Sequence, residues 1–412
     1  MFPTDSTRAW RSLGSRLGAL CDVPAEGRAP ALEGIRGLAI VLVFFVHYHT
    51  LFGDYAQSDA ISHFTSQFLG TVGHCGVDLF FVLSGFLIYG LVLRKRTPYL
   101  KFIQRRVERI YPTFAAVFGL YLVLSFLSPN ENKIPSLPAA AFGYLLANAA
   151  LLPGLFNIRP IITVAWSLSY EFAFYAVVPL IVSGLSLATW SSSARVKFLA
   201  VICAGFIIVF IGRSAPLLRM SMFIAGMLVY EALGSHRFRS SLSSNVERFA
   251  IVLLLVAFPV AYVLLRRGAA DDSGPLSWNV PVVAILFITF FAFVSCVVGF
   301  DGTLRRFFSL PLLRRAGNIS YSFYLIHGVS LKALSTAMHT YAPAHPHHPI
   351  LLFWMMLPLA FGCSVVAAIG LFHAVERPLS LSPHERRSEV RAHGLRDSTA
   401  DRRAGRTLTA VP

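Results

Sequence analysis

The chain contains ten long apolar stretches that are separated by short polar segments. Each stretch is close to the roughly 20 residues that an α-helix needs to cross the hydrocarbon core of a bilayer. Hydrophobic residues make up 55% of the 412 residues and charged residues only 14%, whereas about a quarter of the residues in soluble domains are charged. Runs this long and uniformly apolar exclude barrel strands, so only helices satisfy the backbone polar groups in lipid. We therefore predict an all-α, polytopic bundle of about ten transmembrane helices, at residues 34–52, 76–93, 108–127, 166–187, 197–212, 217–233, 249–265, 280–300, 317–339 and 350–374.

The positions of the basic residues predict how this bundle is oriented. With ten spans and a cytoplasmic N-terminus, 28 of the 36 Lys and Arg residues lie in cytoplasmic segments, 6 lie outside, and Arg36 and Lys332 lie within helices. A further apolar segment, 139–153, would change this split to about 16 inside and 18 outside if it also crossed. Basic residues concentrate in cytoplasmic loops. We therefore predict that both termini are cytoplasmic and that 139–153 is a re-entrant or interfacial segment on the outer side.

The same distribution accounts for the net charge of +16. Because the basic residues flank the spans on one side, they indicate membrane topology and contact with anionic lipid rather than a nucleic-acid partner. The expected surroundings are the lipid bilayer of the cell membrane, inner or plasma.

Three segments of different composition follow one another along the chain. Residues 1–30 form a basic arm that either lies on the inner membrane surface or is disordered, 31–380 form the membrane domain, and 381–412 form a polar tail that we expect to be disordered. The five cysteines contain no CxxC pair, so no structural disulfide is predicted. The histidines of 338–349 lie among prolines without acidic neighbours, so no metal site is predicted.

Two polar residues interrupt the first span. Arg36 and His47 are eleven residues apart, which is close to three helical turns, so both side chains project from one face at a separation of roughly 16 Å. Such groups are costly in lipid and indicate protein or a water-filled cavity on that face. The imidazole suits removal of a proton from a hydroxyl, and the guanidinium suits a phosphate. The alternative is an interfacial arginine and a histidine that is hydrogen-bonded to a neighbouring helix.

A cluster of arginines precedes the third span. Arg105, Arg106 and Arg109 share one turn at its expected cytoplasmic start. This arrangement is suited to phosphate groups, and simple membrane anchoring is the alternative interpretation.

Two carboxylates lie near the expected outer ends of spans. Asp78 opens the second span, where it either caps the helix or orients a histidine, and Ser84 and Gly85 permit close helix approach. Glu171 lies at or just inside the outer end of the fourth span, where it is a general base, a histidine partner, a hydroxyl binder or half of a buried Glu–Arg pair.

Polar and aromatic residues in later spans complete the candidate site. Ser320, Tyr324 and His327 share one helix face at i, i+4 and i+7. His327 is either a second site histidine or a hydrogen-bonding residue between helices. Together with Trp166, whose ring suits a sugar face but also any membrane interface, these are the expected substrate-binding residues.

Taken together, these motifs resemble the acyltransferase-3 family of integral membrane acyltransferases over about residues 30–380. The Arg-x10-His pair is followed, in family order, by four further patterns. They are Gly-Val-Asp-x-Phe-Phe-x-x-Ser-Gly-Phe at 76–86, Arg-Arg-x-x-Arg-Ile-x-Pro at 105–112, Trp-Ser-Leu-x-x-Glu at 166–171 and Glu-x-Pro at 376–378. Each pattern alone is weak evidence for the resemblance, but five patterns in the family order on a protein with ten predicted spans are strong evidence.

The resemblance implies transfer of an acyl group, usually acetyl from acetyl-CoA, to a hydroxyl of a carbohydrate, a lipid-linked glycan or a macrolide-like acceptor. It assigns His47 as the catalytic base, Asp78 and Glu171 as site carboxylates, and Arg36 as a donor-site residue. Arg105, Arg106 and Arg109 would form the cytoplasmic entrance for coenzyme A.

The residues themselves agree with that chemistry, and they leave alternatives open. Arginines at the inner face would hold the phosphates of acyl-CoA while the thioester reaches towards His47, with direct transfer or an acyl-enzyme as the route. A proton-coupled transporter or flippase would also need intramembrane His, Arg and Glu residues. A structural or sensory membrane protein is the remaining alternative.

Overall fold

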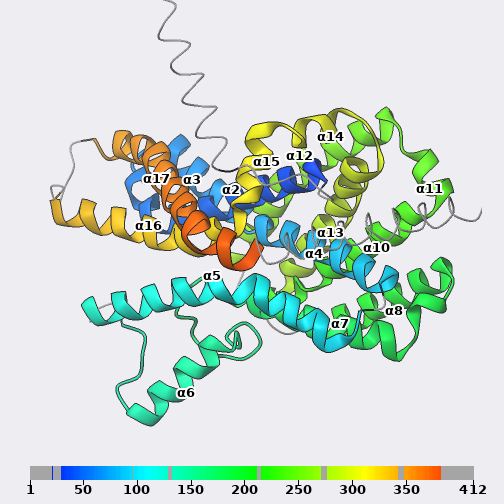
Figure 1. The fold of residues 1–412 in the computed structure, drawn as a ribbon. Helices are drawn as coiled ribbons and strands as arrows, with labels where there is room; N and C mark the ends of the chain where they lie inside the picture. Colours follow the sequence, from blue (N-terminus) through cyan, green and yellow to red (C-terminus); the bar gives the residue numbers. More distant parts are fainter. Residues whose placement is uncertain are drawn as a thin grey trace, which may run out of the picture.

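The computed structural model describes residues 21, 29–95, 97–128, 132–210, 215–270, 276–341 and 348–381. Within these ranges helices are present and strands are not, which confirms the predicted all-α bundle (Figure 1). The α-helices are α2 (Pro30–Phe52), α3 (Ala60–Gly73), α4 (Cys75–Arg94), α5 (Tyr99–Leu127), α6 (Pro138–Ala149), α7 (Ala165–Gly184), α8 (Ser192–Phe210), α9 (Ala215–Leu218), α10 (Ser221–Gly234), α11 (His236–Ser241), α12 (Ser244–Ala270), α13 (Leu276–Gly299), α14 (Thr303–Phe308), α15 (Pro311–Asn318), α16 (Ser320–Tyr341) and α17 (Pro349–Leu371). Two 3₁₀ turns, η1 (Gly53–Ala56) and η3 (Leu187–Thr189), and a π-helix, η4 (Phe372–Leu381), join or extend them.

Eight helical segments of the described chain are long and apolar enough to cross a membrane. They are Pro30–Ala56, Ala60–Arg94, Tyr99–Leu127, Ala165–Gly184, Ser192–Val209, Ser244–Arg267, Val280–Gly299 and Pro349–Leu381. The other two predicted spans correspond to α10, an apolar helix of 14 residues, and α16, a helix of 22 residues that carries His327 and Lys332. The ambiguous segment 139–153 forms α6, which has only 12 residues and is too short to cross unaided.

Several predictions fall outside the described residues. They concern nearly all of the basic arm and the polar tail, and the histidine-rich segment at 342–347. All five cysteines are described, and each is a free thiol.

The centre of the bundle depends on close approach between α4 and α10. A Cβ atom placed on Gly85 would overlap the backbone carbonyl of Phe223, and one placed on Gly226 would overlap that of Val82. Small residues allow such contact between helices that cannot rely on the hydrophobic effect in lipid. The prediction that Gly85 permits close helix approach is thus confirmed.

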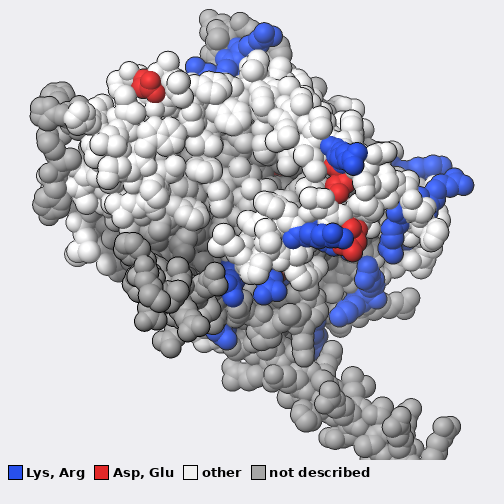
Figure 2. Space-filling view, turned by 90° about the horizontal axis from the view of Figure 1, so that it is seen from above, with Lys and Arg blue, Asp and Glu red and all other residues white. Residues whose placement is uncertain are grey.

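Charged and apolar surfaces are segregated. Figure 2 shows Lys and Arg side chains at the right, the end at which Figure 1 shows α11, along the lower middle and at the top, whereas the white surface at the upper left carries one acidic group. Large apolar side chains are instead exposed along α5, α8 and α12, as in Phe126, Ile208 and Leu255. Exposed apolar surface of this kind suits contact with lipid.

Candidate functional site

A pocket opens between α2, α4, α5, α7 and α16 and encloses about 810 Å³, its open mouth included. Its polar lining consists of Arg36, Ser84, Arg106, Arg109, Ser167, Glu171, Tyr175, Ser320, Tyr321 and Tyr324, and its apolar lining of Val77, Phe80, Phe81, Leu83, Ile110 and Leu168. Four of the five sequence motifs therefore contribute directly to one cavity. The fifth motif, Glu-x-Pro, does not line the pocket, but its Glu376 forms a salt bridge with the lining residue Arg109.

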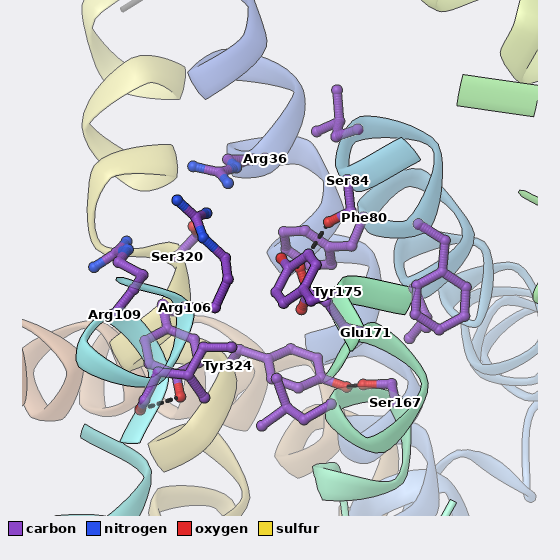
Figure 3. Close-up of a pocket in the computed structure, with 16 residues that line it drawn as sticks. Arg36, Phe80, Ser84, Arg106, Arg109, Ser167, Glu171, Tyr175, Ser320 and Tyr324 are labelled. Carbon is purple, nitrogen blue, oxygen red and sulfur yellow. Dashed lines mark hydrogen bonds between the residues drawn. The ribbon is translucent and has the colours of Figure 1, made fainter. Parts of the chain in front are cut away.

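The guanidinium groups of Arg36, Arg106 and Arg109 lie together on one side of the pocket (Figure 3). Arg106 and Arg109 are three residues apart on α5, so they project from the same face of that helix. Arg36 comes from the start of α2, and its Nη1 lies 3.4 Å from Oε2 of Glu33. Three cations from two helices thus face one cavity, whose lining contains a single carboxylate, Glu171.

Arg109 is fixed by a buried acid. Its Nη1 donates to Oε1 of Glu376 at 2.8 Å, and the Glu376 side chain is fully buried. Oε2 of Glu376 accepts hydrogen bonds from the backbone N–H and the hydroxyl of Ser322, at 3.1 and 2.5 Å. Glu376 lies in the π-helix η4, so this acid joins the end of the chain's last described helix to α5 and α16. The Glu-x-Pro motif is visible in the sequence, but this contact of Glu376 was not predicted from it.

Arg106 has a different environment. No salt bridge to it is present in the described part of the chain, and its buried Nε has no hydrogen-bond partner there. Its guanidinium carbon lies 5.5 Å from the ring centre of Phe102 and 5.9 Å from that of Tyr175, within the range of a cation–π contact. A cation held by aromatic rings keeps its N–H donors available for an anion.

Glu171 is held by hydroxyl groups. Ser84 Oγ donates to Oε1 of Glu171 at 2.6 Å, and the Tyr175 hydroxyl donates to the same oxygen. Among the described residues no salt bridge to Glu171 occurs. The structure therefore favours the hydroxyl-bound carboxylate over the buried Glu–Arg pair that the sequence left open.

The start of α7 lies deeper in the bundle than the sequence indicated. The hydroxyls of Ser167 and Tyr324 are 2.6 Å apart, although the predicted topology starts the span of Ser167 on the outer side and that of Tyr324 on the cytoplasmic side. The preceding segment is buried, with Ile161 and Ile162 at most 2% exposed. Lys133 Nζ donates to the backbone carbonyl of Ile161 at 3.1 Å. Because this segment runs into the bundle, the motif around Glu171 meets arginines that we placed at the other end of the molecule.

The two predicted site histidines lie beside each other, next to the pocket. The ring centres of His47 and His327 are 5.0 Å apart, and the ring of Tyr324, a lining residue, is 6.2 Å from that of His327. Neither histidine lines the pocket itself. The pocket wall formed by Tyr324 and the edge-on ring of Phe80 thus adjoins the histidine pair.

Three further predicted residues do not line the pocket. Asp78 is fully buried and forms a salt bridge with Arg219, a residue that the sequence analysis did not single out. Arg105 is half-buried on α5 beside the two lining arginines. Trp166 packs edge-on against Tyr170, with ring centres 5.7 Å apart.

Comparison with known proteins assigns this architecture to a family. Residues 30–373 match the family model of the acyltransferase-3 family, described as an acyltransferase domain. This chain is a member of the acyltransferase-3 family. The same range holds every pocket-lining residue, so the pocket belongs to the acyltransferase domain.

Two of three similar proteins also carry acyltransferase or acetyltransferase names. Acyltransferase MdmB of Streptomyces mycarofaciens is 30% identical, in an alignment that covers 74% of this chain and 79% of MdmB. The exopolysaccharide production protein ExoZ of Rhizobium meliloti is 28% identical over 65% of this chain and 79% of ExoZ. The O-acetyltransferase OatA of Staphylococcus aureus is 24% identical over 72% of this chain and 50% of OatA. No solved structure matches the chain.

The family and the fold together define the kind of enzyme. This acyltransferase is a multi-pass membrane protein, because it combines eight candidate spanning helices among its described residues with membership of a family of membrane acyltransferases. In the described part of the chain no group of three His, Cys, Asp or Glu side chains is arranged to hold a metal ion.

Proposed function

We propose that this acyltransferase moves an acyl group, acetyl in the simplest case, from cytosolic acyl-CoA to a hydroxyl of a carbohydrate, a lipid-linked glycan or a macrolide-like acceptor. The enzyme would act in the cell membrane, inner or plasma. His47 is the general base of the transfer. The observation that carries this proposal is the pocket in which Arg36, Arg106 and Arg109 face Glu171, Tyr175 and Tyr324.

The arginine side of the pocket suits the donor. Coenzyme A carries several phosphates on a long, flexible arm, and guanidinium groups bind phosphate through paired N–H donors. Arg109 is already paired with Glu376, so it supplies a fixed positive wall. Arg106, which has no salt bridge in the described chain, is the group best placed to take a phosphate.

The opposite side of the pocket suits the acyl end of that arm. Tyr324, a lining residue, lies beside the histidine pair, and its ring and that of Phe80 offer an apolar wall to a pantetheine chain. His47 would take the proton of the acceptor hydroxyl as the hydroxyl oxygen attacks the thioester carbonyl. The C–S bond then breaks, the acyl group stays on the acceptor oxygen, and the coenzyme A thiolate receives the proton from His47.

The chemistry of the acceptor is supported by the names of similar proteins. ExoZ is named for exopolysaccharide production and OatA as an O-acetyltransferase. A hydroxyl-bearing carbohydrate and an acetyl donor are therefore the first substrates to test.

The first test compares matched variants of the purified, membrane-reconstituted protein. Release of coenzyme A thiol from acetyl-CoA would be followed with and without pooled cell-envelope glycans, for wild type, His47→Ala and His63→Gln. A general base contributes about 10²- to 10⁴-fold, so His47→Ala should lose at least about 100-fold in kcat. His63, which contacts Gln67 and lies outside the pocket lining, should tolerate its substitution.

Donor binding is tested with a second matched pair. Arg106→Gln and Arg105→Gln remove the same charge one residue apart, but only Arg106 lines the pocket. We expect the dissociation constant of acetyl-CoA to rise about tenfold for Arg106→Gln, since a charge-assisted hydrogen bond is lost, and to change less than about twofold for Arg105→Gln. Equal effects of the two substitutions would reject the pocket as the donor site. Absence of acetyl-CoA binding to wild type would instead support transport.

A further inference from the structure

His327 has one nitrogen bonded and one nitrogen free. Its side chain is fully buried, and its Nδ1 lies 3.0 Å from the backbone carbonyl oxygen of Phe323, one turn earlier on α16. The ring stacks on Phe323 at 5.5 Å with an interplanar angle of 6°. Its Nε2 is also buried and has no hydrogen-bond partner among the described residues.

These contacts define the tautomer of a neutral His327. A carbonyl oxygen only accepts hydrogen bonds, so Nδ1 carries the hydrogen and Nε2 carries a lone pair. A buried acceptor without a donor is destabilising by about 1–3 kcal/mol. A phenylalanine of similar shape would avoid this cost, so the lone pair indicates a role that packing alone does not explain.

The donor that best fits this lone pair is His47. The two ring centres are 5.0 Å apart with planes tilted by 58°, and in this arrangement no hydrogen bond joins the two rings. An N–H···N hydrogen bond of about 3 Å between facing imidazole nitrogens places the ring centres roughly 5 Å apart, so a rotation of the His47 ring is enough to form one without moving either helix. Among the described residues no other hydrogen bond engages a ring nitrogen of His47, so nothing there opposes a turn of this ring towards His327. His47 is also the less buried of the two, which leaves its outer nitrogen closer to a substrate.

We propose that His327 is a positioning residue whose Nε2 accepts the N–H of His47 and so leaves the other nitrogen of His47 unprotonated, ready to act as the base. This inference rests on the proposed function, because it assigns His327 a task within that reaction. The arrangement parallels other enzymes in which a third group fixes the tautomer and orientation of a catalytic histidine. Here that group is a second imidazole, itself fixed by the Phe323 carbonyl.

Three substitutions at position 327 distinguish a role in positioning His47 from a role in packing alone. In His327→Gln the side-chain amide reaches the position of Nε2 and retains an acceptor there. In His327→Asn the amide reaches only the position of Nδ1, and in His327→Phe the shape remains without an acceptor. We expect kcat to fall about 10- to 100-fold for Asn and Phe, as for other partners that orient a functional histidine, and to stay within about threefold for Gln. The dissociation constant of acetyl-CoA should remain unchanged in all three variants.

A purely structural role would give another pattern. Loss of activity that follows the melting temperature, or equal losses for Gln and Asn, would overturn the proposal. Wild-type kcat in His327→Phe would also overturn the proposal. Donor binding that weakens in parallel with kcat would also overturn it, since it would assign His327 to the donor pocket.

A spectroscopic measurement keeps this inference separate from the proposed function. Protein labelled with ring-¹⁵N histidine would be studied in nanodiscs, with signals assigned through His47→Gln and His327→Gln. We expect a coupling across the hydrogen bond between the two rings in wild type and its loss in His327→Phe. If wild type binds no acetyl-CoA but shows the coupling, the proposed function fails and the pairing stands. If it turns over acetyl-CoA without the coupling, the positioning role fails alone.

Discussion

Asp78 and Glu171 are two carboxylates of the same membrane domain with opposite surroundings. Asp78 is fully buried and forms a salt bridge with Arg219, whose side chain is 15% exposed. Glu171 lines an open pocket and accepts hydrogen bonds from the hydroxyls of Ser84 and Tyr175. Asp78 is paired with a charged residue and does not line the pocket, whereas Glu171 lines the pocket and is hydrogen-bonded to neutral hydroxyls.

This difference separates a structural acid from a functional one. A carboxylate paired with arginine in a dry site has its charge compensated and offers little to a substrate. A carboxylate that is held by hydroxyls beside a pocket stays within hydrogen-bonding reach of bound groups. We therefore expect Asp78 to act on stability and Glu171 to act on turnover, although the sequence analysis placed both in the catalytic site.

The largest expected effect is the loss of stability in Asp78→Asn. The substitution leaves Arg219 without its countercharge, and breaking one side of a buried pair is destabilising by about 3–5 kcal/mol. The measurement is the free energy of unfolding in mixed micelles, together with the yield of monodisperse protein.

A double substitution checks the cause. Asp78→Leu combined with Arg219→Met removes both charges and should recover most of the lost stability, because an apolar pair often replaces a buried ion pair without penalty. If Asp78→Asn is as stable as wild type but inactive, Asp78 belongs to the catalytic machinery and the comparison with Glu171 fails.

In contrast to Asp78→Asn, Glu171→Gln should lower turnover and leave stability nearly unchanged. The amide keeps the size of the side chain, and the Ser84 and Tyr175 hydroxyls still find an oxygen acceptor, so unfolding should change by less than about 1 kcal/mol. Loss of the charge facing the pocket should lower kcat about 10- to 100-fold, the lower range for an electrostatic or acid–base group. Steady-state kinetics with acetyl-CoA and glycan acceptors measure this. A large loss of stability with unchanged kcat would show that the two carboxylates play the same structural role.

The sequence predicted the class of fold because lipid restricts the choice. Long apolar runs in a chain with 14% charged residues leave a helical bundle as the physical solution. The arginine pair at Arg106 and Arg109 was also predictable, since residues three apart share a helix face. Both outcomes depend on local pattern and composition alone.

Contacts between distant helices were not predictable in the same way. Nothing in the periodicity of α4 indicates that Asp78 meets Arg219, which is 141 residues away. The depth of α7 depends on the irregular segment before it, whose Ile161 backbone N–H donates a hydrogen bond to Oδ1 of Asn148 in α6. Hydropathy measures the length of a span but not where a re-entrant segment turns, so the sequence did not indicate that Glu171 shares a pocket with Arg106 and Arg109.

The smallest expected effect concerns one hydroxyl donor of Glu171. Ser84→Ala removes the 2.6 Å hydrogen bond and leaves the Tyr175 hydroxyl on the same carboxylate oxygen. A net hydrogen bond to a charged group contributes about 1.5–3 kcal/mol, and the pocket lets water replace part of it, so kcat should fall only about three- to tenfold. The matched control is Ser364→Ala, which removes a buried serine whose hydroxyl bonds the Ala360 carbonyl far along α17. The comparison of the two carboxylates predicts that Ser84→Ala lowers kcat and that Ser364→Ala does not, since only Ser84 lies in the pocket with Glu171. Equal kcat for the two variants would mean that the hydroxyls do not orient Glu171, and its distinction from Asp78 would then depend on exposure to the pocket alone.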